Sequence, residues 1–328
     1  MKKSKRLVYN TLMFFALPIT YISAVWLKYI RKAGQHNLTD NIFMKLGVLP
    51  VLDHYYQPLI NPHKYLKKPL NGERYLPAIN MCVEEQLTFL AELNYGNELI
   101  LFPLEKRSQN EFYYNNGSYC SGDAEYLYSV IRKTKPSKII EIGSGQSTLM
   151  VQNALIKNSD DNSSYRCDHT CIEPYEQPWL ETINVNLIRK KVEEIDLSLF
   201  SSLGRNDILF IDSSHIIRAQ GDVLCEYLEI LPSLKEGVLI HIHDIFTPRD
   251  YPESWINEHL LWNEQYLLEA FLSFNTEYKV IGALNYLSNN FKKEFSAVCP
   301  IYALQPGRQP GALWLVKTSN HKTTRSPD

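Results

Sequence analysis

The sequence KIIEIGSGQST, at residues 138–148, decides the fold class. Its first five residues are mostly apolar, which is typical of a short strand buried in a sheet. The next six, GSGQST, form a glycine-rich turn directly ahead of the helix-compatible segment LMVQNALIK. A strand, a glycine-rich turn and a helix in this order predict the start of a doubly wound α/β sheet, in which the turn lets the backbone approach a ligand.

Further apolar segments follow at the spacing that a parallel sheet requires, at residues 165–172, 185–188, 207–211 and 237–242. Glu173 follows the first of these segments, and Asp212 and His215 follow the third. His243 and Asp244 follow the last. Because open parallel sheets bind ligands at the carboxyl ends of their strands, we predict that these polar side chains gather at one edge of the sheet.

The last part of the chain predicts an antiparallel strand pair at the edge of the sheet. Residues 278–287 and 311–317 are apolar strand candidates, and three prolines lie between them. A nicotinamide-dependent dehydrogenase is the alternative, but it would favour more parallel strand–helix–strand units and a complete Gly-x-Gly-x-x-Gly fingerprint. The third glycine of that fingerprint is missing here.

The series EIGSGQST, CIEPYE, NDILFIDSSH and GVLIHIHDIF resembles the successive motifs of class I S-adenosylmethionine-dependent methyltransferases, over about residues 110–317. The resemblance implies a Rossmann-like methyltransferase sheet and S-adenosylmethionine as the cofactor. It implies that the first acid and the glycine turn hold the methionine end and that Glu173 binds the ribose hydroxyls. The cofactor-binding residues that it implies are Glu141, Gly143, Ser144, Gly145, Glu173 and Asp212.

The wider pattern, including HDIFTPRDYPESW, resembles a bacterial subgroup of these enzymes associated with surface polysaccharide or glycolipid loci. This resemblance implies O-methylation of a glycan or glycolipid precursor. A methyltransferase fold that serves only as a catalytically inactive binding module at the membrane is the non-enzymatic alternative. The retained acids and glycines of the motifs argue against such decay.

We predict His215 and Asp244 as catalytic residues that remove a proton from the methyl acceptor. A histidine suits this role because its pKa lies near neutrality, although His215 could instead cap its loop. Asp212, His243 and Asp244 together could hold a divalent cation such as Mg²⁺. A cation is not expected, because His243 replaces the third acid that metal-dependent relatives carry.

The segment at residues 247–275 is longer than a minimal connection between strands. It includes Arg249, Tyr251 and Trp255, whose charged and aromatic side chains suit a lid over a sugar or polar headgroup. The helix expected from Glu253 onward could equally form an oligomer contact. The oligomeric state therefore stays open.

The amino terminus has the pattern of a membrane-associating helix. Residues 2–6 and 28–32 are basic, whereas residues 7–27 are uncharged and mostly apolar. Such a length can cross a bilayer core of about 30 Å. Because S-adenosylmethionine is cytosolic, we predict peripheral or single-pass association with the cytoplasmic face, and an interfacial helix keeps both basic flanks at anionic headgroups. A buried helix packed on the catalytic domain is the alternative.

The composition limits the classes of function that the protein can have. The 34 basic and 36 acidic residues leave a net charge of −2, which argues against a nucleic-acid binder. The six cysteines form no Cys-x-x-Cys pair, so we expect reduced, mostly buried thiols.

These patterns together predict four parts of the chain. We predict a hydrophobic helix at residues 1–36, an irregular arm and an amphipathic helix at 37–110, a methyltransferase domain at 111–318, and a disordered tail at 319–328.

Overall fold

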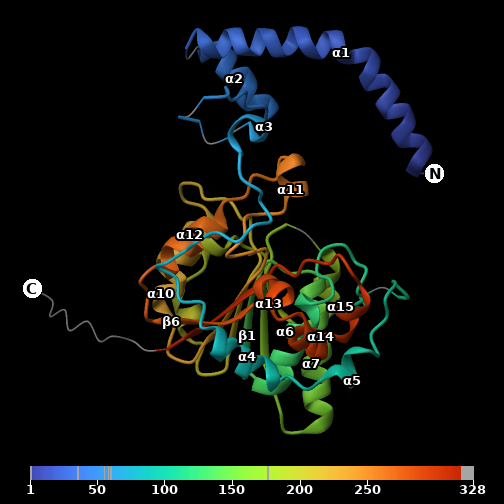
Figure 1. Cartoon of the computed structure of the whole chain (residues 1–328), viewed down its shortest axis with the longest axis vertical. Helices are drawn as coiled ribbons and strands as arrows, with labels where there is room; N and C mark the ends of the chain where they lie inside the picture. Colours follow the sequence, from blue (N-terminus) through green and yellow to red (C-terminus); the bar gives the residue numbers. More distant parts are fainter. Residues whose placement is uncertain are drawn as a thin grey trace, which may run out of the picture. The chain divides into compact units, whose positions relative to one another are not determined.

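The computed structural model describes residues 2–318, apart from residues 35–36, 55, 58, 60, 109 and 176 (Figure 1). It divides into two compact units, Met1–Pro69 and Leu70–Asp328. The expected disordered tail at residues 319–328 lies outside the described residues.

The second unit is built on a seven-stranded sheet in the order β3-β2-β1-β4-β5-β7-β6. The strands are β1 (Lys138–Ile142), β2 (Asp168–Ile172), β3 (Asn186–Ile188), β4 (Ile208–Ile211), β5 (Leu239–Ile242), β6 (Tyr278–Ala283) and β7 (Leu313–Lys317). The first five strands pair in parallel, and β7 is antiparallel to both β5 and β6. The predicted doubly wound sheet with an antiparallel pair at its edge is confirmed.

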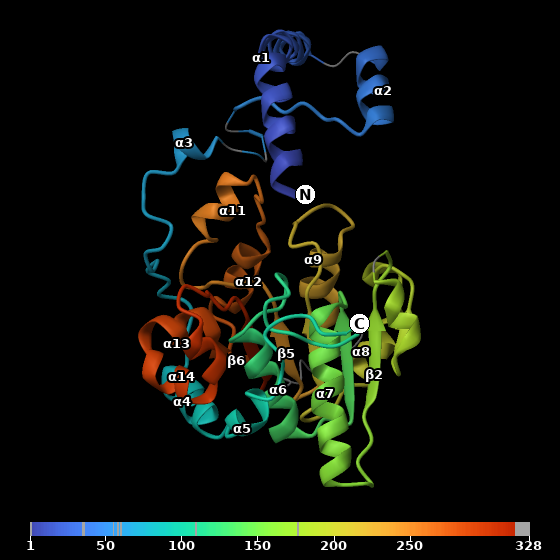
Figure 2. The same cartoon turned by 90° about the vertical axis from the view of Figure 1, so that its right-hand side faces the viewer.

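The sheet is covered on both faces, as Figure 2 shows. Successive side chains of a strand point to opposite faces, so Ile139 packs into one hydrophobic core and Ile140 into the other. The longer helices of this unit are α4 (Val83–Ala91), α6 (Asp123–Thr134), α7 (Gln146–Asp161) and α12 (Glu264–Leu272). The shorter ones are α5 (Gly96–Leu99), α8 (Leu197–Ser201), α9 (Asp222–Cys225), α10 (Leu231–Ser233), α11 (Glu253–Asn257), α13 (Leu284–Asn290), α14 (Lys292–Val298) and α15 (Pro300–Leu304).

The strand predicted at residues 278–287 is too long. It ends at Ala283, and α13 begins at the next residue. Leu284 and Leu287 are both fully buried in the same core. Residues three apart lie on one face of a helix but on opposite faces of a strand, so a helix buries both leucines where a strand would expose one.

The first unit contains α1 (Lys2–Lys32), α2 (Asn37–Leu46) and α3 (Pro62–Tyr65). Its segment Arg6–Lys32 is long and apolar enough to cross a membrane, judged by length and composition. Pro18 lies within α1, which Figure 1 shows bent, and a proline inside a helix removes one backbone hydrogen bond.

The prediction of an irregular arm from residue 37 is wrong for α2. Arg31, at the end of α1, donates to Asp40 Oδ1 (3.0 Å) and to the Pro50 carbonyl oxygen (2.8 Å). Asp40 lies in the first turn of α2 and Lys45 in its last turn, where their charges favour the helix dipole. These contacts order a segment that shows little apolar periodicity.

Candidate functional site

Gly143, directly after β1, can only be a glycine. Its φ is +76°, and a Cβ atom built there would lie 1.8 Å from the Asp212 carbonyl oxygen. This backbone region favours glycine. Gly143 therefore lets the carboxyl ends of β1 and β4 meet closely.

At Gly145, by contrast, packing within the protein does not require a glycine. Its φ is −174°, an extended conformation open to other residues, and no described atom lies within 4 Å of the Cβ position. Packing within the protein therefore requires a glycine at Gly143 and not at Gly145. Gly145 borders open space.

Glu141 is fully buried and holds the start of α7. Its carboxylate accepts hydrogen bonds from Ser147 Oγ (2.6 Å) and Thr148 Oγ1 (2.7 Å). Thr148 Oγ1 in turn accepts from the Gly145 N–H (3.0 Å). Glu141 therefore shapes the glycine turn from beneath, rather than reaching a ligand directly.

His169 and Cys171 complete this buried group. His169 Nε2 lies 3.2 Å and Cys171 Sγ 3.5 Å from Glu141 Oε2. Burial raises the pKa of the Cys171 thiol. All six cysteines are free, and four of them are buried, whereas Cys120 and Cys167 are only partly buried.

A cavity of about 350 Å³, here called the first cavity, opens at the carboxyl ends of β1, β2 and β4. Of the six predicted cofactor-binding residues, Gly143, Glu173 and Asp212 line it. The size is that of a small-molecule site. Glu173 is held at its wall, where its carboxylate accepts from the Tyr175 N–H (2.9 Å) and from the Ser144 N–H (3.4 Å). Glu141, Ser144 and Gly145 do not line this cavity.

A second cavity, of about 310 Å³, lies beside the carboxyl end of β5. His243 and Asp244 line it, together with Asp123 at the start of α6. The wall of this cavity also includes Trp255 of α11 and Arg308. The predicted aromatic lid residue Trp255 therefore does contact the site, whereas Tyr251 is buried.

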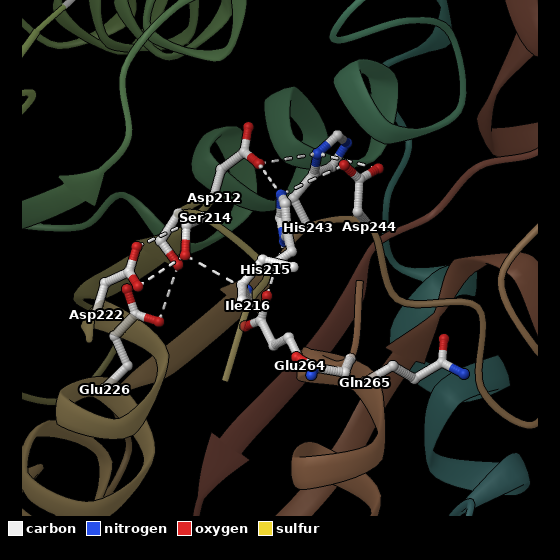
Figure 3. Close-up of polar contacts among 12 residues, drawn as sticks. Asp212, Ser214, His215, Ile216, Asp222, Glu226, His243, Asp244, Glu264 and Gln265 are labelled. Atoms are coloured by element: carbon white, nitrogen blue, oxygen red, sulfur yellow. Dashed lines mark hydrogen bonds and ion pairs between the residues drawn. The ribbon is translucent and has the colours of Figure 1, made fainter. Parts of the chain in front are cut away.

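Two carboxylates and two imidazoles form a compact cluster between the cavities (Figure 3). Asp212 Oδ1 lies 3.2 Å from His215 Nε2 and 3.4 Å from His243 Nδ1. The Asp244 carboxylate lies 3.5 Å from the same two nitrogen atoms. Because Asp212 lines the first cavity and Asp244 the second, this cluster connects the two.

The cluster changes the protonation of its members. Burial opposes a charge on His243, but Asp244 and Asp212 outweigh it and raise its pKa to about 10. His215 is also buried, and Asp212 and Glu264 raise its pKa. Burial opposes ionisation of the Asp212 carboxyl, but the attraction of His243 and His215 outweighs it and lowers the pKa of Asp212. Burial raises the pKa of Asp244.

Both loops that carry the cluster hold a site residue in the left-handed backbone region. His215 has φ +60° and Asp244 has φ +57°. Non-glycine residues seldom adopt this conformation, and its strain is often found at functional sites. The conformation turns each side chain back toward Asp212.

Glu264, at the start of α12, belongs to the site although no sequence motif singled it out. Its Oε2 lies 2.7 Å from His215 Nδ1, and Tyr227 OH donates to its Oε1 (3.0 Å). The Trp262 ring lies 4.3 Å from the His215 ring, centroid to centroid. An acid in the first turn of a helix is commonplace, so sequence alone offered no signal.

His241 takes no part in the cluster. It is fully buried and stacks on Phe210 with ring centroids 4.2 Å apart. Burial lowers its pKa, so it stays neutral.

Three residues of the site could together ligate a metal ion: Asp212, His215 and Asp244. Each offers one ligand atom, and these atoms lie within 4.8 Å of one another. This group differs from the predicted one in containing His215 in place of His243. Two carboxylates and an imidazole fit a divalent cation that keeps several waters. The Glu264–His215 contact is of the kind that orients a ligating imidazole.

Residues 140–245 match the family model of a methyltransferase domain. This range runs from β1 to the residue after Asp244, so it contains both loops of the cluster. An uncharacterized protein of Archaeoglobus fulgidus is 28% identical over 181 residues, which are 52% of this chain and 80% of that protein. The centre of the chain is therefore similar to a methyltransferase domain.

Solved structures of methyltransferases are similar at greater distance. An O-methyltransferase from Bacillus cereus in complex with SAH is 13% identical with a TM-score of 0.36, covering 71% of this chain and 91% of its own. TomG from Streptomyces achromogenes, in complex with SAM, has the same identity and TM-score, with 75% and 92% covered. MycE in complex with Mg, SAH and mycinamycin VI is 13% identical with a TM-score of 0.33, with 60% and 50% covered.

Proposed function

We propose that the protein is an S-adenosylmethionine-dependent O-methyltransferase, with the cofactor in the first cavity and the methyl acceptor in the second. The observation that carries this proposal is the cluster between the cavities. Asp212 faces one cavity and Asp244 the other, and His215 and His243 contact both carboxylates. A transfer between two bound molecules requires such a junction of two sites.

The residues of the first cavity fit the cofactor. S-adenosylmethionine, when bound, supplies a methyl group on a positively charged sulfur. Glu173, at the end of β2, has the position from which an acid accepts hydrogen bonds from ribose hydroxyls. Asp212, whose pKa is lowered, supplies a negative charge at the other end of the cavity.

Asp244 is the group that removes the proton from the acceptor. It lines the second cavity, whereas the His215 side chain is only 5% exposed and lines neither cavity. His215 reaches the acceptor only through Asp244 and is a positioning residue in this proposal. The proton of the acceptor hydroxyl passes to an Asp244 oxygen as the hydroxyl oxygen becomes the nucleophile.

The strand order favours this reading over a nicotinamide-dependent enzyme. In the dinucleotide-binding fold the sixth strand continues the parallel sheet. Here the antiparallel β7 lies between β5 and β6.

The acceptor proposed is a glycan or glycolipid precursor. Such an acceptor fits the wall of the second cavity, which is aromatic and polar and includes Trp255 and Ser118.

We place the protein at the cytoplasmic face of the membrane. The apolar segment Arg6–Lys32 supports this, with Phe15, Tyr21 and Trp26 exposed. A helix lying in the headgroup region would keep its basic residues at anionic lipids.

The purified protein, incubated with S-adenosylmethionine labelled in the methyl group and a total glycolipid extract, tests the activity. We expect label in the extract and binding of S-adenosylhomocysteine by calorimetry. Asp244→Asn should reduce transfer by roughly 10²–10⁴-fold, while Asp160→Asn, at an exposed position of α7, should not. Binding without any transfer would favour the inactive binding module, and absence of binding would refute the cofactor assignment.

A further inference from the structure

A third cavity lies beside the second one. It has a volume of about 290 Å³ and is called the distal cavity. Four residues line both it and the second cavity, namely Phe246, Pro252, Ser254 and Gln309. The two adjacent cavities are together called the groove, and Asp244 lines only the second cavity.

The walls of the distal cavity offer neutral hydrogen-bonding groups. Asn71, Asn285 and Gln309 each carry an amide with both donors and acceptors, and Ser254 carries a hydroxyl. Phe246, only 3% exposed, also lines the cavity beside them. Amides beside an aromatic ring match the alternation of hydroxyl groups and C–H faces in a sugar.

The charges of this cavity are largely compensated within the protein. Arg249 Nη2 lies 3.7 Å from Glu73, and Asp250 Oδ1 lies 3.2 Å from Arg74 Nε. Glu253 is the remaining charged residue of the lining. A wall of this kind recognises a neutral polyhydroxyl group better than an ion, because each paired charge is offset by its partner.

The wall is also held in place before any ligand arrives. Asn285 Nδ2 donates to the Pro310 carbonyl oxygen (3.1 Å). The Gln265 side chain ties the loop from both sides, since it accepts from the Phe246 N–H (2.6 Å) and donates to the Arg249 carbonyl oxygen (2.8 Å). A groove with fixed walls selects its ligand at low entropic cost.

We propose that the groove binds an acceptor of at least two linked sugar units, with the methylated unit beside Asp244 and the next unit in the distal cavity. This inference rests on the proposed methyltransferase function and narrows its substrate class. The second cavity alone lies at the lower end of the roughly 300–1,000 Å³ that ligand sites span, and the distal cavity, at about 290 Å³, lies just below that range. A monosaccharide would leave the distal half of the groove unused.

Two acceptor pools and one blocking variant test this inference. The first pool is an intact glycan and glycolipid extract, and the second is the same extract hydrolysed by acid to monosaccharides. We expect the full-length protein to methylate the intact pool at least 10-fold faster. Asn71 is exposed and lines only the distal cavity, so Asn71→Trp should block that cavity and reduce transfer to the intact pool at least 10-fold.

The controls separate a local effect from a folding defect. Asn71→Trp should bind S-adenosylhomocysteine as the unmodified protein does, and Asn71→Ala should raise KM without lowering kcat. Asn94→Trp, also exposed but lining neither cavity, should leave transfer unchanged. Equal methylation of monosaccharides, or an unaffected Asn71→Trp, would overturn the two-unit acceptor alone. Absence of transfer to either pool would overturn the methyltransferase function as well.

Discussion

The Glu264 carboxylate lies 2.7 Å from His215 Nδ1, although the two residues are 49 positions apart in the sequence. The contact directs the other ring nitrogen, Nε2, toward Asp212 and Asp244. Tyr227 completes the arrangement by donating to the second oxygen of Glu264. Glu264 thereby fixes the orientation of the imidazole that joins the two cavities.

Replacing Glu264 by glutamine should lower kcat by about 10–100-fold, the range that applies to partners orienting metal-ligating histidines. S-adenosylhomocysteine affinity should stay unchanged, because Glu264 does not line the first cavity. The pH–rate profile should shift, since the His215 pKa is raised in part by Glu264. Glu226→Gln is the matched control, as Glu226 is equally buried nearby and hydrogen-bonds Ser213 instead. Equal losses in both variants would argue for a merely structural Glu264.

Glu226 predicts a pH dependence of stability. Burial raises the pKa of its carboxyl in the folded protein above the unfolded value of about 4.3. The folded state therefore keeps a proton that the unfolded state releases, and stability falls as pH rises above that value. Relative to the unmodified protein, Glu226→Gln should become more stable as the pH rises from 5 to 8, because glutamine has no proton to release. Urea unfolding at both pH values measures this, and a pH-independent difference would contradict it.

The two glycines of the turn should respond differently to alanine. Gly143→Ala should destabilise the protein by roughly 3 kcal/mol or more, because its Cβ would overlap the Asp212 carbonyl oxygen. Gly145→Ala should leave the melting temperature nearly unchanged, since no described atom lies near the new Cβ. Any loss of S-adenosylhomocysteine affinity in Gly145→Ala would then report contact with the cofactor. A strongly destabilised Gly145→Ala would contradict the geometry.

Glu173→Ala should weaken S-adenosylhomocysteine binding by about 1.5–3 kcal/mol, the value of hydrogen bonds to a charged group. Titration calorimetry measures the change. Glu236→Ala, at an exposed site that pairs with Arg205, is the control and should bind normally. Unchanged affinity in Glu173→Ala would remove the ribose contact from the proposal.

The proposed membrane association can be tested by dividing the chain at the boundary between its two units, between Pro69 and Leu70. Deleting residues 1–69 should release the protein from the membrane fraction, and the fragment should still bind S-adenosylhomocysteine. Deleting residues 1–32 tests the contribution of α1 separately. Flotation with vesicles that contain anionic lipid should recover the full chain and not the shorter fragment. Aggregation of both fragments would instead make the first unit part of the folded core.

Local sequence pattern was sufficient for the strands that form the ligand-binding edge. The segments that stop directly before Glu173, Asp212 and His243 predict parallel strands, because burial on both faces favours mostly apolar segments. The polar residues then follow at the strand ends by chain order alone. Residues 284–287 were predicted wrongly, because a short apolar run fits either a strand or a helix and packing of Leu284 and Leu287 decides between them.

Sequence alone shows which residues follow the strands at the carboxyl edge of the sheet, since that depends only on where each buried strand ends. The tertiary structure determines which groups each of these residues contacts. It turned Glu141 inward to Ser147 and Thr148. It also brought Glu264 to His215, across 49 positions of sequence. Hydrophobic periodicity is a local property of the chain, whereas partners of buried polar groups depend on which distant segments the fold brings within hydrogen-bond distance.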